Sequence, residues 1–84
     1  CTNCTTIHPM VTMHRGPNWK ISVYGRDHGL PQFHVEGPGF RAWVAIATLE
    51  VVIGTVPAAA LRAALVWAEE NRELLLATWQ ELNP

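Results

Sequence analysis

The sequence predicts an α+β domain, in which an antiparallel β-meander of three to four strands is followed by two C-terminal helices packed on one face. Three observations carry this prediction. Apolar and polar residues alternate in short segments of the first half, as in half-buried strands. Turn sequences such as GPN and GPG separate these segments. The last third is rich in alanine, leucine and glutamate, which favour helices.

The strands follow from the alternation. Residues 10–15, MVTMHR, form a first β-like stretch. The clearer strand segments are 18–24, 32–36 and 40–47, with 49–54 as a short further candidate. In the segment 32–36, Phe33 points inward while His34 points to the polar side; in 40–47, Trp43 lies on the face opposite Val44.

Two helices are expected at 57–70 and 72–82. Pro57 suits the first position of a helix, where its missing N–H costs nothing. A single continuous helix would place Arg72 within the apolar stripe, so we expect a break beside it. Asn71 is expected to cap the second helix.

The chain has 84 residues, which is the size of one domain. Residues 1–9, CTNCTTIHP, are polar and show no periodicity, so we expect a flexible N-terminal extension followed by a single domain over 10–84. Cysteines occur only at positions 1 and 4. The remaining chain therefore needs no disulfide framework, and we expect a cytoplasmic protein.

Composition constrains the partners. Charged residues are only 15% of the chain while hydrophobic residues are 49%, so we expect apolar surface covered by a second copy or by a small partner protein. The net charge of −1 with scattered basic residues makes nucleic-acid binding an unfavoured function. No apolar run approaches the roughly 20 residues that span a bilayer, so no membrane association is expected.

The stretch 27–37, DHGLPQFHVEG, holds the most distinctive polar residues. His28 and His34 are candidate ligands for a divalent metal such as zinc, because imidazole is the commonest metal ligand. Asp27, Glu36 and His14 could complete a site. The alternative is that Asp27 caps a turn and His34 is an ordinary exposed strand residue, so no cofactor is required.

Other chemical motifs are weaker. The spacing Cys1-x-x-Cys4-x-x-x-His8 supplies three ligands without a second pair. Ser22 is the only serine and lacks a nucleophile-elbow motif. A histidine acting on RNA is chemically feasible, yet no complete catalytic set is present, which favours a role other than enzyme. Trp43, together with Tyr24, is instead expected to contribute to a partner surface.

The stretch DHGLPQFHV resembles the signature D-H-N-P-P-H-F-H-V of a small bacterial family known as domain-of-unknown-function family 4160. The resemblance extends from residue 10 to 82 and includes the run ATLEVVIG and the closing helices. The matching signature positions are Asp27, His28, Pro31, Phe33 and His34. Gln32 stands where the family has histidine, so half of the family's histidine pair is missing.

The resemblance implies a short cytoplasmic chain whose gene lies beside that of another small protein, in pairs described as toxin–antitoxin-like. Two hypotheses result. The first is a protein-interaction or regulatory component, a homodimer or one half of such a pair, with a surface formed by Asp27, His28, Pro31, Phe33, His34 and Trp43. The second is a histidine-dependent site at His28 and His34, which binds metal or acts as a ribonuclease-like toxin.

Overall fold

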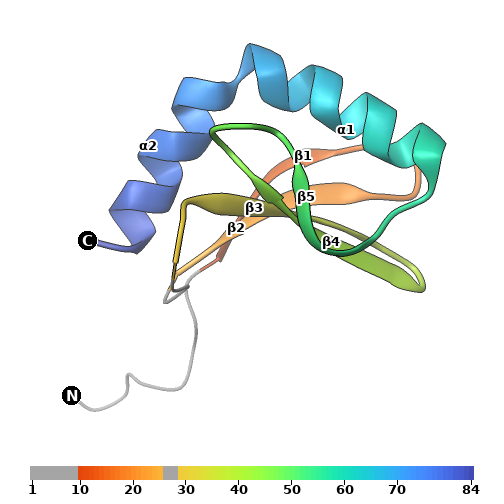
Figure 1. The fold of residues 1–84 in the computed structure, drawn as a ribbon, viewed down its shortest axis with the longest axis horizontal. Coiled ribbons are helices and arrows are strands. Elements are labelled where there is room, and N and C mark those ends of the chain that lie inside the picture. The colour runs from red at the N-terminus through yellow and green to blue at the C-terminus, as the bar shows by residue number, and fades with distance from the viewer. Residues whose placement is uncertain (1–9, 26–28) are drawn as a thin grey trace.

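A computed structural model describes residues 10–25 and 29–84, which form one five-stranded antiparallel sheet followed by two helices (Figure 1). The strands are β1 Met10–Arg15, β2 Lys20–Tyr24, β3 Gln32–Gly37, β4 Phe40–Ala45 and β5 Val51–Thr55. Each strand pairs with the next one along the chain, in the order β1-β2-β3-β4-β5. The α+β class and the meander are therefore confirmed.

The predicted count of three to four strands is wrong, because residues 10–15 pair with β2 as a full strand. A β-bulge explains why the alternation of apolar and polar residues in 10–15 is weak. Thr12 lies opposite Ser22 and His14 lies opposite Ile21, so the register shifts between Thr12 and His14. The extra residue interrupts the two-residue alternation that identifies a strand in sequence.

The core lies between the sheet and the two helices, which cover one face (Figure 1). Five strand residues are fully buried on this side: Ile21, Val23, Phe33, Val35 and Val44. The predicted inward direction of Phe33 is therefore confirmed. These five residues pack with Ala64, Ala68 and Leu75 of the helices. The alternation in sequence thus separates a core face from a second, polar face.

Helix α1 spans Ala58–Glu70 and helix α2 spans Arg72–Leu82, close to the predicted 57–70 and 72–82. The break falls at Asn71 as predicted, but its role differs. Its side chain makes no N-cap hydrogen bond to α2; instead its Nδ2 donates to the carbonyl oxygen of Trp67 at 2.9 Å. Asn71 therefore completes the end of α1, where carbonyl groups lack helical partners.

Candidate functional site

The polar face of the sheet, opposite the helices, carries two transverse rows of side chains. Directly opposed residues of paired strands point to the same face, so the register gives both rows. The charged row contains Arg15, Lys20, Glu36, Arg41 and Thr55. The middle row contains Thr12, Ser22, His34, Trp43 and Ile53. Four strands thus bring together charges that are far apart in the sequence.

His34 lies in the middle row with an aromatic ring on each side. Its ring centroid is 4.5 Å from that of Tyr24 and 5.2 Å from that of Trp43, with the Trp43 ring stacked at 23°. Tyr24 comes from β2 and Trp43 from β4, the two neighbours of β3. His34 is consequently only 5% exposed, so the expectation of an exposed strand residue at this position is wrong.

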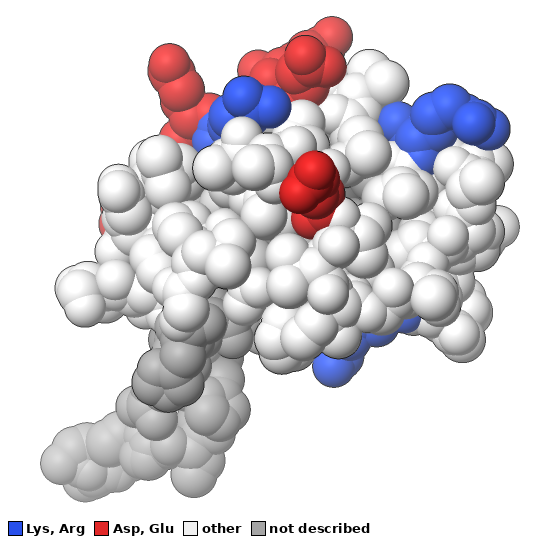
Figure 2. All heavy atoms as spheres, in the orientation of Figure 1, with Lys and Arg blue, Asp and Glu red and all other residues white. Residues whose placement is uncertain are grey.

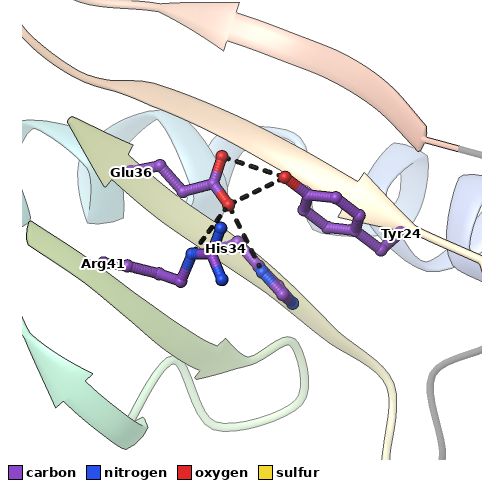
Figure 3. A network of polar contacts seen from close by, with 4 residues as sticks. All are labelled: Tyr24, His34, Glu36 and Arg41. Atoms are coloured by element: carbon purple, nitrogen blue, oxygen red, sulfur yellow. Dashed lines mark hydrogen bonds and ion pairs between the residues drawn. The ribbon is translucent and has the colours of Figure 1, made fainter.

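Glu36 is the centre of a polar network on this face (Figure 3). The Tyr24 hydroxyl donates to its Oε2 at 2.8 Å and lies 3.1 Å from its Oε1. Arg41 Nε is 3.3 Å from Oε2, and His34 Nδ1 is 3.6 Å from the same oxygen. Glu36 is 8% exposed, and a carboxylate so buried requires such partners.

The arrangement indicates a structural role for the carboxylate. Both oxygens of Glu36 face Tyr24 or Arg41, so neither is directed to a substrate as a general base would be. Within residues 10–25 and 29–84, no three His, Cys, Asp or Glu side chains gather into a metal-binding group. Glu36 thus connects Tyr24 and His34 on the polar face, and Trp43 stacks on His34.

The structure places the predicted site residues in different environments. Asp27 and His28 lie outside the described residues. Pro31 is half-buried, and its carbonyl oxygen accepts a hydrogen bond from the Ile46 N–H at 3.1 Å. Phe33 is fully buried in the core on the helix side, so its side chain is not presented to a partner. His34 and Trp43 are brought together on the polar face, where Tyr24 and Glu36 also contact His34.

Strand β5 supplies a surface to which the sequence analysis gave no role. It is an edge of the sheet, and all five of its residues are exposed. Val51, Val52 and Ile53 are 40%, 47% and 53% exposed. The signal in the sequence is the run VVIGT, which contains neither charge nor proline, the two features that usually protect an edge strand.

The model of a family described as Domain of unknown function (DUF4160) matches residues 18–80. Searches of curated proteins and of solved structures gave no match. Over the described part of the chain, neither helix has the length and apolar character that a membrane span needs.

Proposed function

The chain belongs to the family Domain of unknown function (DUF4160), and on this premise we propose that it is a protein-interaction domain that pairs with a second copy of itself along β5. The observation that carries the proposal is the exposed apolar edge formed by Val51, Val52 and Ile53. An edge strand offers unpaired backbone N–H and C=O groups to another strand. Strand addition at such an edge is a common mode of protein recognition.

A second copy suits this edge because β5 is complementary to itself. Two antiparallel β5 strands related by a two-fold axis through Ile53 place Ile53 opposite Ile53, Val51 opposite Thr55 and Val52 opposite Gly54. None of these residues is charged, so the pairing brings no like charges together. A two-fold contact of one patch with itself is the commonest form of homodimer.

The apolar surface at the β5 edge is continuous with apolar side chains on the polar face of the sheet. Ile53 lies directly opposite Trp43 in the β4–β5 ladder, and Trp43 is itself held against His34. Ile53 and Trp43 together extend the apolar surface beyond the strand edge. Aromatic side chains held in place in this way often dominate interface energies.

The low charge of the surface supports association with protein rather than with nucleic acid. Figure 2 shows a face on which most charged side chains lie at the margin. The net charge of the chain is −1, so two copies repel each other weakly. The resemblance to the family adds the cellular setting that we propose: a bacterial, cytoplasmic regulatory component of a two-gene, toxin–antitoxin-like module.

Light scattering on the unmodified chain and on Ile53→Lys tests the proposal. We expect the unmodified chain to be a dimer. Ile53→Lys places two ammonium groups opposite each other and removes two apolar contacts, so we expect the dissociation constant to rise more than about tenfold. Val66→Lys is the matched control, because Val66 is 59% exposed and belongs to α1 rather than to the sheet.

Three outcomes would contradict this proposal. The unmodified chain could remain a monomer at high concentration, Ile53→Lys could dimerise as well as the unmodified chain, or Val66→Lys could dissociate the dimer equally. The hypothesis of a histidine-dependent site has its own measurement. Metal bound in stoichiometric amount to untagged protein, and lost in His34→Ala, would favour that hypothesis instead.

A further inference from the structure

A pocket of about 430 Å³ opens between the β1–β2 turn and the β3–β4 turn. Arg15 and Lys20 line it on one side, and Glu36 lies at the end of β3. Trp19 contributes to the wall, as do Pro17 and Pro38, and these three residues are largely apolar. Pockets of this volume accommodate small organic ligands.

The charge within the pocket is uneven. Lys20 lies directly opposite Glu36 in the β2–β3 ladder, yet the Glu36 carboxylate is turned toward Tyr24 and Arg41. In the part of the chain that the structure describes, neither Arg15 nor Lys20 forms an ion pair with a carboxylate. The Glu36 carboxylate is engaged by Tyr24 and Arg41 rather than by Arg15 or Lys20, so both of these cations can interact with a bound anion.

We propose that this pocket binds a small phosphorylated ligand that carries a ring, of the nucleoside monophosphate type. Arg15 offers a planar fork of N–H donors that matches phosphate oxygens. Lys20, its cross-strand neighbour, adds a second positive charge for the same group. Trp19 and the two prolines offer an apolar wall for the ring.

Two features limit the ligand to a small molecule. Among the residues that the structure describes, the cations lining the pocket are Arg15 and Lys20, with the Glu36 carboxylate beside them, and this is too little charge to follow a polynucleotide backbone. The pocket is also bounded by turns at two adjacent hairpins. The site therefore fits one phosphate with one attached group.

Nuclear magnetic resonance titration tests the proposal, with adenosine monophosphate and inorganic phosphate as separate probes. We expect saturable shifts at the amides of residues 15–20 and 36–38 with adenosine monophosphate, and weaker binding at higher salt. Inorganic phosphate should bind the same residues more weakly, because it lacks the ring. The variant Arg15→Gln/Lys20→Gln should lose more than about tenfold in affinity.

Arg62→Gln is the matched control, because Arg62 is an exposed cation on α1 that does not line the pocket. It should bind adenosine monophosphate as the unmodified chain does. Three results would overturn the site. The amide shifts could fail to saturate, the folded Arg15→Gln/Lys20→Gln variant could keep its affinity for adenosine monophosphate, or Arg62→Gln could lose affinity equally. Equal affinity for the two probes would overturn the part of the proposal that concerns the ring. The Ile53→Lys variant should bind normally, so this test is independent of dimerisation.

Discussion

The Tyr24 hydroxyl donates to the Glu36 carboxylate across the β2–β3 pair, with oxygen–oxygen distances of 2.8 and 3.1 Å. In the ladder, the residue opposite Glu36 is Lys20, four positions before Tyr24. The tyrosine side chain therefore runs back along the polar face, past the His34 ring, to reach the carboxylate. This contact links the aromatic group on that face to the charged row.

Removing this hydroxyl should destabilise the protein. Tyr24→Phe keeps the ring that contacts His34 but leaves the buried Glu36 carboxylate with one fewer donor. We expect the free energy of unfolding to fall by about 1–3 kcal/mol. Urea denaturation measures this change, and a double-mutant cycle with Glu36→Gln gives the coupling of the pair. No coupling between the two sites would show that the contact contributes nothing.

Removing a different hydroxyl from the same strand and face should have the opposite sign. Ser22 is fully buried, and its Oγ has no hydrogen-bond partner among the residues that the structure describes. Burial of an unsatisfied hydroxyl costs roughly 1–3 kcal/mol. We therefore expect Ser22→Ala to keep or raise the free energy of unfolding in the same urea experiment. A loss as large as that of Tyr24→Phe would disprove the assignment.

Gly54 in β5 should not tolerate a side chain. Its φ is +90°, and a Cβ at this position would lie 2.2 Å from the Arg41 carbonyl oxygen. Backbone strain and this clash together should cost about 3 kcal/mol or more in Gly54→Ala. Thermal unfolding followed by circular dichroism is a suitable measurement.

Gly39 provides the matched control, because its φ is +79° but a Cβ there would have no neighbour within 4 Å. Gly39→Ala should therefore cost only the strain, about 1–2 kcal/mol. Equal losses in the two alanine variants would mean that the close approach to Arg41 is not what requires glycine at position 54.

Asn83 should hold the end of α2 against the sheet. Its Nδ2 lies 3.1 Å from the Tyr24 carbonyl oxygen and 3.0 Å from that of Trp79. We expect Asn83→Ala to cost about 1 kcal/mol and to speed hydrogen exchange in the last turn of α2. The comparison is Asn71→Ala, since the Asn71 amide donates to a carbonyl of its own helix. If exchange in α2 rises as much in Asn71→Ala, the link to Tyr24 has no special role.

The fold was largely predictable because burying one face of a strand or helix requires apolar residues at a regular spacing. The alternation around Ile21 and Val35 gives the strands and their core face, and the helix break beside Arg72 follows from its charge. Residues 10–15 were recognised as β-like but not counted as a strand, because the bulge between Thr12 and His14 in β1 interrupts the alternation. The capping role of Asn71 was misassigned because its side-chain amide can accept from the start of α2 or donate to the end of α1. The sequence does not distinguish these two hydrogen bonds, and in the structure the amide donates to Trp67 of α1.

The candidate site was less predictable for a different reason. Trp43 and His34 were selected individually, but their stacking depends on the β3–β4 register, which single-strand patterns do not give. The charged row depends on four strands in register. The exposure of Ile53 depends on β5 being the last strand of the sheet, and alternation alone does not say which strand lies at an edge.

The order of the strands also has a kinetic consequence. Every strand pairs with its neighbour along the chain, so each hairpin can close over a short loop without a search for a distant segment. Polypeptides with more such nearby contacts refold faster than those that depend on distant pairings. The apolar edge at β5 would then spend little time exposed in partly folded molecules, which limits its opportunity to aggregate during synthesis.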